Sequence, residues 1–192
     1  MAVGIVNTLV AVVVALVSLR FLLQLTQANF YNPICQGVNR FTAPLIAPFR
    51  ALPVIGSLNV GVLVSATLLQ ALGAGLLFYL GGGLPGIIPL LAWSALSVVG
   101  LMLDLIFYAL LGMIILSWLA PQASHPGAEL VNQLSDPFLE PIRRFIPDLG
   151  GLDLSPIALF IALNIVEAML INGPARSLGL SSAVARYFVG LG

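Results

Sequence analysis

Long apolar runs constrain this chain more than any other feature. The run Val3–Leu25 is interrupted by Asn7 and Arg20, and the run Asn59–Leu80 ends at the breaker sequence GGGLPG. An α-helix needs about 20 residues to cross roughly 30 Å of hydrocarbon, so both runs predict membrane-spanning helices. The first run has no basic segment before it and is longer than a signal-peptide core of about 7–15 residues, which indicates a retained span.

Two further apolar segments follow. The run Pro85–Leu119 is too long for one ordinary span, so we expect a short first segment, Ile87–Ala95, and a separate third span, Leu96–Leu119. A fourth, shorter span is expected over Pro156–Asn172, where the sequence NGP ends the run. The predicted fold class is an all-α polytopic membrane protein with four transmembrane helices.

The composition excludes several functional classes. Charged residues make up 7% of the chain, whereas a soluble domain carries roughly a quarter. The seven cations are all arginines and are scattered, so they form no basic face for nucleic acid. Cys35 and His125 are the single representatives of their types, which leaves no internal disulfide, thiolate cluster or two-histidine site. We therefore expect no cofactor, no metal site, no nucleic-acid contact and no enzymatic activity.

The two halves of the chain repeat each other. The segment NRFTAPLIAPFRALP (Asn39–Pro53) matches NQLSDPFLEPIRRFIP (Asn132–Pro147) in an asparagine, a hydroxyl, two prolines and an arginine. The short segments GSLN (Gly56–Asn59) and GGLD (Gly150–Asp153) also match. Each repeat is a span, a connector and a span, so the repeats are in tandem with the same orientation and both connectors lie on one membrane face. The expected divisions are a degenerate first repeat at 1–82, a linker or short interfacial segment at 83–95, a second repeat at 96–173 and a C-terminal interfacial tail at 174–192.

Proline punctuates the second connector. Because proline breaks helices, Pro137, Pro141 and Pro147 should divide this connector into short pieces with fixed bends. The stretch PIRRFI, which begins at Pro141, is typical of a helical turn lying in the interface with its arginines at the lipid phosphates. Asp153 or Ser155 is expected to cap the fourth span.

The charges of the connectors have two interpretations. They stabilise a helix–turn–helix hairpin, through pairing of the acids with the arginines, or they bind lipid headgroups or acidic groups of a partner. The candidate residues for such binding are Arg50, Arg143, Arg144, Asp136 and Asp153.

The stretch DPFLEPIRRFIPDLGGLDLSPIALFIAL, with its degenerate upstream copy, resembles the signature of the YggT family of small bacterial membrane proteins, related to YlmG of cyanobacteria and plastids. The resemblance implies four membrane helices in two repeats, location in the bacterial inner membrane and no established enzymatic activity. It associates bacterial members with osmotic-shock tolerance and ion balance, and the relatives with division, nucleoid distribution and haem attachment. Haem handling does not suit this chain, because His125 stands alone.

The first copy of the motif departs from the family pattern. Ala43 replaces the acid, and Leu25 stands where a tryptophan is usual. The second copy keeps Trp118 but has Met113 where Arg20 would align. The second copy is therefore expected to be the better binding motif.

Four polar residues inside the predicted spans are candidates for a functional site: Arg20, Asp104, Asn164 and Glu167. Three of them are ionisable, and ionisable groups in hydrocarbon are costly and mark functional sites by default. Arg20, five residues before the end of its span, either extends to the headgroups or pairs with Asp136, Asp153 or a connector carbonyl.

Asp104 and Glu167 are expected at similar depth, on the side opposite the connectors. They could share a proton, coordinate a cation or pair with Arg176, and Asn7 and Asn164 could add neutral oxygens. The alternative is that each carboxylate reaches separately to the interface or to a neighbouring hydroxyl.

The arginine distribution favours cytoplasmic connectors. The connector face carries Arg40, Arg50, Arg143 and Arg144, whereas only Arg176 and Arg186 belong to the other face.

Two functions remain open. The first is a scaffold or assembly factor of the bacterial inner membrane, acting in osmotic and extracytoplasmic stress tolerance, whose connectors engage the lipid bilayer or other membrane proteins. The second is a small channel or ion or osmolyte transporter that uses Asp104 and Glu167. Four helices rarely enclose a pore alone, so the second function requires a homo-oligomer.

Overall fold

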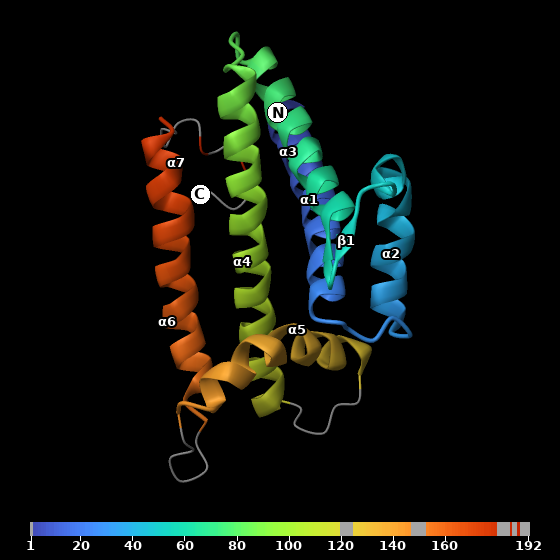
Figure 1. The fold of residues 1–192 in the computed structure, drawn as a ribbon, viewed down its shortest axis with the longest axis vertical. Helices are drawn as coiled ribbons and strands as arrows, with labels where there is room; N and C mark the ends of the chain where they lie inside the picture. Colours follow the sequence, from blue (N-terminus) through green and yellow to red (C-terminus); the bar gives the residue numbers. More distant parts are fainter. Residues whose placement is uncertain (1, 120–124, 147–152, 180–184, 186–187, 189–192) are drawn as a thin grey trace.

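Three long apolar helices form the centre of the molecule. The computed structural model describes residues 2–119, 125–146, 153–179, 185 and 188. Within them α1 (Ala2–Leu25), α3 (Val60–Leu80) and α4 (Ile87–Leu119) are long and apolar enough to cross a membrane. The order of packing is α1 on α3 and α3 on α4 (Figure 1). The first two predicted spans are therefore present almost residue for residue.

A shorter apolar helix lies along the other side of α4. Helix α6 (Ser155–Glu167) continues through the π-helical turns of η2 (Ala168–Asn172) into α7 (Gly173–Ser177). It packs against α4 and α5 and stands apart from α1 and α3 (Figure 1). The predicted fourth apolar segment is thus a helical element of the expected place and length.

Helix α4 corrects the prediction for the third span. The structure has one continuous helix of 33 residues and no break between Ile87–Ala95 and the rest. Pro89 lies in its first turn, where a missing N–H costs no intrahelical hydrogen bond, and no other proline follows before Leu119. At 1.5 Å per residue the helix is about 50 Å long, so it exceeds the hydrocarbon thickness.

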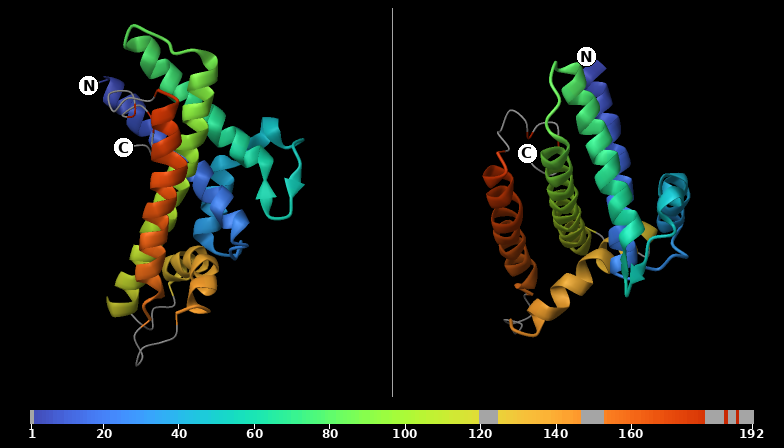
Figure 2. Two further views of the ribbon diagram at one scale, coloured as in Figure 1. Left: turned by 60° about the vertical axis from the view of Figure 1, so that its left-hand side comes forward. Right: turned by 45° about the horizontal axis from the view of Figure 1, so that its top comes forward.

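Both connectors lie at the same end of the bundle. Helix α2 (Pro33–Ile46) stands beside the end of α1, whereas α5 (Pro126–Arg143) lies across the ends of the long helices (Figures 1 and 2). The chain therefore leaves and re-enters the bundle at this end in both halves, as two repeats of the same orientation require.

Helix α5 corrects the prediction that proline divides the second connector. Pro137 and Pro141 both lie inside one helix of 18 residues, and Arg143 is its last residue. Both prolines are exposed, so water or headgroups can reach the carbonyl groups that lose their helical donors. The buried side of the same helix carries Leu134 and Leu139. Pro147 lies outside the described residues.

A small hairpin follows the first connector and has no counterpart in the sequence expectations. After the 3₁₀ turn η1 (Ala47–Phe49), strands β1 (Val54–Ile55) and β2 (Leu58–Asn59) pair antiparallel. Gly56, with φ of 62°, makes the turn between them, a backbone conformation that glycine adopts without strain. The hairpin leads directly into α3, where the Asn59 side chain accepts the N–H of Val62 at 3.3 Å.

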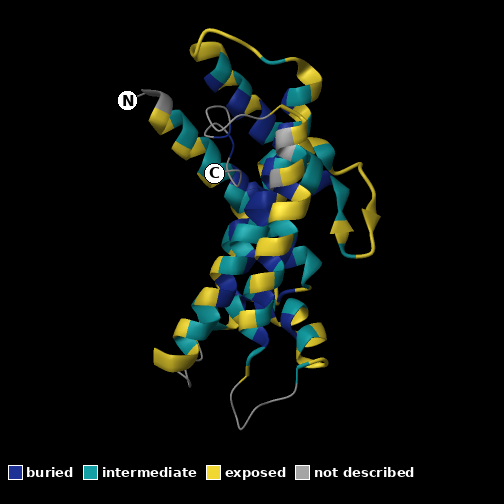
Figure 3. Cartoon of the chain, turned by 90° about the vertical axis from the view of Figure 1, so that its left-hand side faces the viewer, coloured by how far each residue is buried: buried dark blue, intermediate teal, exposed yellow. Residues whose placement is uncertain are grey.

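The apolar core joins the two repeats. It runs from α1 and α3 through α4 to α5 and α6, and buried positions alternate with exposed ones along each helix (Figure 3). Its most deeply buried members include Val14, Val17, Val62, Val98, Leu110 and Leu139. Helices α1 and α3 approach closely at Gly73, where even one added methyl group would overlap the side chain of Val10.

Candidate functional site

Arg143 is the centre of an ion-pair group in the second connector. Its Nε lies 3.0 Å from Oδ2 of Asp153, and its Nη1 lies 3.4 Å from Oδ1 of Asp136. The second oxygen of Asp153 accepts the backbone N–H of Ser155 at 2.8 Å, at the first residue of α6. The Asp153 carboxylate therefore joins the end of α5 to the beginning of α6. The ion pairs confirm the predicted pairing of Arg143 with Asp136 and Asp153. The N-cap position of α6 is Leu154, so Asp153 accepts the first helical N–H from one residue before the cap.

The pKa values of the pair reflect this arrangement. Burial by itself would raise the pKa of Asp153, but the hydrogen bonds from Ser155 and the Arg143 charge outweigh it and hold the pKa below its ordinary value. For Arg143 burial acts in the lowering direction, and Asp153 and Asp136 outweigh it, so its pKa is raised. Both groups are held in their charged forms.

Arg144 is also paired within its own helix. Its Nη2 lies 2.6 Å from Oε1 of Glu140, one turn earlier, and both side chains are exposed. Both arginines of the second connector thus have acidic partners within the chain. The candidate binding residues Arg143, Asp136 and Asp153 form one group, and Arg144 belongs to a separate surface pair.

The first connector has a different charge environment. Arg50 follows η1 and is exposed, and no ion pair to it occurs in the part of the chain that the structure describes. The aligned positions of the acids Asp136 and Glu140 are Ala43 and Ala47. Arg50 therefore stands apart from the other candidates of the connector set.

Of the two roles expected for Arg20, extension to the headgroups or pairing within the chain, the structure shows pairing within the chain. Its Nη1 donates to the backbone oxygen of Asn39 and to Oγ1 of Thr42, both at 3.0 Å. The partners are thus a connector carbonyl and a hydroxyl, not Asp136 or Asp153. Its Nε is buried and has no partner within the described residues. Arg20 ties α1 to α2, and Thr42, which the sequence marks as a repeated hydroxyl, is the partner that sequence analysis missed.

The second repeat lacks this tie. Met113 occupies the position aligned with Arg20, and Ser135, aligned with Thr42, is fully buried on α5. A thioether cannot donate a hydrogen bond, so Met113 cannot make the connection that Arg20 makes in the first repeat.

The two connectors also contact each other. The Asn29 backbone N–H donates to Oε1 of Gln133 at 2.9 Å, and its side-chain Nδ2 donates to Oε1 of Glu129 at 3.1 Å. Nearby, Asn32 donates to the backbone oxygen of Pro126 at 2.7 Å. These bonds connect segments about a hundred positions apart, and no sequence signal indicated them.

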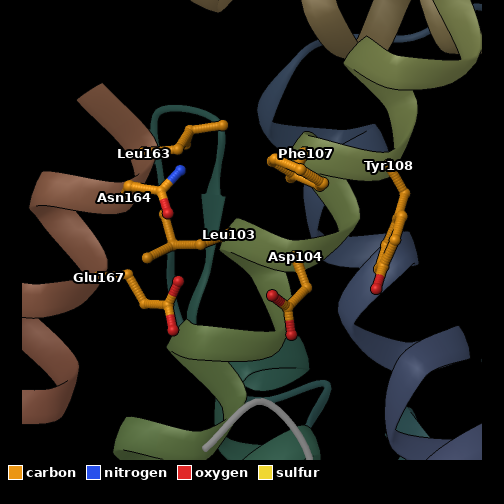
Figure 4. Close-up of a pocket in the computed structure, with 7 residues that line it drawn as sticks. All are labelled: Leu103, Asp104, Phe107, Tyr108, Leu163, Asn164 and Glu167. Atoms are coloured by element: carbon orange, nitrogen blue, oxygen red, sulfur yellow. The ribbon is translucent and has the colours of Figure 1, made fainter. Parts of the chain in front are cut away.

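The two carboxylates of the predicted spans, Asp104 and Glu167, line one pocket away from the connectors. A pocket of about 150 Å³ lies between α4 and α6, with Asp104 on one helix and Glu167 on the other. Figure 4 shows the two carboxylates at the same level of the pocket, with Asn164 on the α6 side and Tyr108 beyond Asp104. The lining residues are Leu103, Asp104, Phe107, Tyr108, Leu163, Asn164 and Glu167.

The pocket has the properties of a polar groove at membrane depth. Because α4 is continuous, Asp104 lies near its middle, 17 residues after Ile87 and 15 before Leu119. Neither Asp104 nor Glu167 has a hydrogen bond or ion pair to the described residues. Two ionised carboxylates in one such pocket repel each other, which favours a shared proton or an external cation. Glu167 also immediately precedes the π-helical turns of η2, a feature frequent at functional sites.

Other residues expected near the carboxylates differ in their placement. Asn164 lines the pocket, although its Nδ2 donates to the backbone oxygen of Phe160 at 2.8 Å. Asn7 lies on α1 and does not line it. The side chain of Arg176 lies outside the described residues. No group of three or more metal-ligating side chains occurs among the residues that the structure describes.

These features define a multi-pass helical membrane protein with charged connectors at one end and a carboxylate-lined groove between two helices. The chain belongs to the CCB3/YggT family, whose model matches residues 1–80 and 92–173.

Relatives support this membership over most of the chain. The chain is 44% identical to an uncharacterized protein of Pseudomonas aeruginosa, covering 93% of this chain and 92% of the relative. It is 35% identical to the uncharacterized protein YggT of Escherichia coli K12, covering 84% of each. A YlmG homolog of Arabidopsis thaliana chloroplasts is 38% identical over 38% of this chain and 28% of that protein. No solved structure matches the chain.

Proposed function

We propose that this chain is a non-enzymatic scaffold or assembly factor of the bacterial inner membrane that acts in osmotic and extracytoplasmic stress tolerance. The observation that carries the proposal is the set of hydrogen bonds from Asn29 to Gln133 and Glu129, which fixes two distant connectors into one exposed surface. A surface fixed in this way can present its side chains to a partner with little further loss of conformational entropy. The stress role follows the resemblance to the family.

The side chains on this surface suit the membrane interface. Tyr31, Phe41 and Phe145 are among the most exposed aromatic residues of the described chain, and Arg40 and Arg144 stand next to two of them in sequence. Aromatic rings beside arginines are typical of the headgroup layer, where rings contact acyl chains and guanidinium groups contact phosphates. We infer that the connectors face the cytoplasm and engage both lipid headgroups and other membrane proteins.

Osmotic-shock survival of a deletion strain complemented with variants tests the proposal. The variant Arg144→Gln/Phe145→Ala removes an exposed charge and an exposed ring without touching the Arg143 group. We expect it to lose protection and the capture of partners by crosslinking, while its level in the membrane stays unchanged. The matched variant Asp104→Asn/Glu167→Gln should retain both. Full protection by the connector variant would contradict the scaffold function.

The groove between α4 and α6 favours a second candidate, an oligomeric channel or transporter for ions or osmolytes. Its support is the pairing of Asp104 and Glu167 in one pocket without a described partner. Under this function the carboxylate variant, and not the connector variant, abolishes protection. Ion flux into liposomes that contain the pure protein should then depend on Asp104 and Glu167. Absence of flux from liposomes with active protein would exclude it.

A further inference from the structure

The second repeat contains a built-in anion site. The Asp153 carboxylate accepts from Arg143 Nε at 3.0 Å on one oxygen and from the first N–H of α6 at 2.8 Å on the other. Asp136 adds a second negative charge to the same arginine at 3.4 Å. An anion is thus bound where the connector arginine meets the beginning of the returning helix, and the chain supplies that anion itself.

The first repeat has the same arginine but lacks the anions. Arg50 aligns with Arg143, whereas Asn59 stands in place of Asp153 and Ala43 in place of Asp136. Asn59 still caps its helix through the N–H of Val62, but an amide supplies no charge. The first repeat therefore has the arginine but neither of its acidic partners.

The local packing brings the corresponding parts together in the first repeat too. A methyl group on Gly61, the second residue of α3, would lie 2.5 Å from the backbone oxygen of Phe49 and 3.3 Å from Oδ1 of Asn59. The backbone of Phe49, the residue immediately before Arg50, is therefore packed against the beginning of α3. A side chain larger than hydrogen at Gly61 would force these segments apart.

Arg50 itself is open to an external anion. It is exposed, and no ion pair to it occurs among the described residues. Arg20, the other cation at the end of α1, instead donates through Nη1 to Asn39 and Thr42 on α2. A guanidinium group without an acidic partner can bind an external anion through charge-assisted hydrogen bonds.

We propose that the first repeat binds a phosphate group, from an anionic lipid headgroup or free in solution, at Arg50, the position where the second repeat holds the Asp153 carboxylate. Guanidinium groups bind phosphate through paired charge-assisted hydrogen bonds, and the position at the connector end of the bundle is that of the headgroup layer. The inference rests on the proposed function in that it assigns a ligand class to the same connector surface. It reverses the expectation that the better-preserved second copy is the binding copy.

Titration calorimetry on the purified full-length protein in neutral detergent tests this site. Three probes separate the sources of the phosphate: short-chain phosphatidylglycerol, short-chain phosphatidylcholine and inorganic phosphate. We expect phosphatidylglycerol to bind and phosphatidylcholine to bind much more weakly. Binding of inorganic phosphate as well would assign the site to the phosphate group itself, and its absence would assign it to the lipid.

Reciprocal variants make the test specific. Arg50→Gln should weaken binding about tenfold or more, the effect of losing a charged hydrogen-bond partner. Ala43→Asp/Asn59→Asp, which supplies the internal acids of the second repeat, should abolish binding while leaving Arg50 in place. Conversely, Asp136→Ala/Asp153→Asn should create a second site with the same preference. Arg176→Gln removes an arginine that the sequence assigns to the opposite face; it is the charge-matched control and should bind like the wild type.

Several results would overturn the proposal: no binding of phosphatidylglycerol or phosphate to the wild type, or unchanged binding by Arg50→Gln or by Ala43→Asp/Asn59→Asp. Thermal unfolding of each variant in the same detergent shows whether it is folded, so a loss of binding can be assigned to the site. Because binding is measured without a stress assay or a partner protein, a failure of the scaffold function leaves this result unaffected.

Discussion

The Asp153 carboxylate makes the junction between α5 and α6 dependent on pH. Its pKa is held below the ordinary value because the hydrogen bonds from Ser155 and Arg143 outweigh the opposing effect of burial. A carboxyl group whose folded pKa is depressed stabilises the fold above its unfolded pKa, and this contribution is lost as the pH falls through the folded pKa. We expect the wild type to lose thermal stability as the pH falls from about 5 to about 3, and Asp153→Asn to lose less.

The effect should be modest because the pair is partly exposed. With 36% of the Asp153 side chain and 43% of the Arg143 side chain accessible, solvent screening limits the expected difference to below about 1 kcal/mol. Melting temperatures of both proteins in one detergent at several pH values measure it. Arg143→Gln should also reduce the pH-dependent loss. Parallel curves for the wild type and Asp153→Asn would contradict the assignment.

Single residues show where sequence reasoning succeeds and where it ends. The pairing of Arg143 with Asp136 and Asp153 could be predicted because the three residues are close together in the sequence of the second connector. The choice of Arg20 could not, because it depends on α2 standing beside α1 so that Asn39 and Thr42 reach it.

At the level of elements, close packing of α1 on α3 depends on Gly73. A Cβ atom there would overlap the side chain of Val10, so the helices must shift or Val10 must change rotamer. We expect Gly73→Ala to lower the free energy of unfolding by about 1–3 kcal/mol, although alanine is the better helix former. Unfolding in mixed detergent, followed by circular dichroism, measures the change.

Two variants serve as controls for the Gly73 prediction. Gly37 lies in α2 with nothing within 4 Å of its Cβ position, so Gly37→Ala should be neutral or stabilising by up to about 1 kcal/mol. In Gly73→Ala/Val10→Ala the space is restored, and most of the lost stability should return. Equal loss in the Gly37 and Gly73 variants would show that close packing is not the cause.

The elements differ in how far the sequence predicts them. Span lengths follow from hydrophobicity, so α1 and α3 begin and end within a residue or so of the predicted bounds. The predicted break in α4 was wrong because the run was divided for its length alone, whereas the structure has one helix that is longer than the hydrocarbon layer. The predicted division of α5 was wrong because Pro137 and Pro141 lie on an exposed face of one continuous helix. The hairpin Val54–Asn59 is too short to leave a periodic signal.

For the whole molecule, the same-orientation repeats place both connectors at one end and the α3–α4 turn at the other (Figure 1). The sequence predicts only that Asp104 and Glu167 lie at a similar depth. That they line one pocket depends on the packing of α6 against α4, which the sequence does not indicate. The orientation of this arrangement across the membrane is the prediction that links fold to function, since the scaffold function needs the connectors in the cytoplasm.

The native Cys35 is a poor reporter of this orientation. It is fully buried, and burial together with the charge of Glu129 raises the pKa of its thiol, which lowers the fraction of reactive thiolate. Replacing it by alanine gives a background for single cysteines at exposed positions. Tyr31 and Phe145 report on the connectors, and Leu84 reports on the α3–α4 turn.

Labelling with a membrane-impermeant maleimide tests the orientation in intact cells. With the arginine-rich connectors in the cytoplasm, Leu84→Cys should react at once, whereas Tyr31→Cys and Phe145→Cys should react only after the inner membrane is permeabilised. The reverse pattern would place the connectors outside and remove cytoplasmic partners from the proposed function. Reaction of Tyr31→Cys and Phe145→Cys from opposite sides would contradict the shared face itself, because the bonds from Asn29 to Gln133 and Glu129 require both connectors on one side.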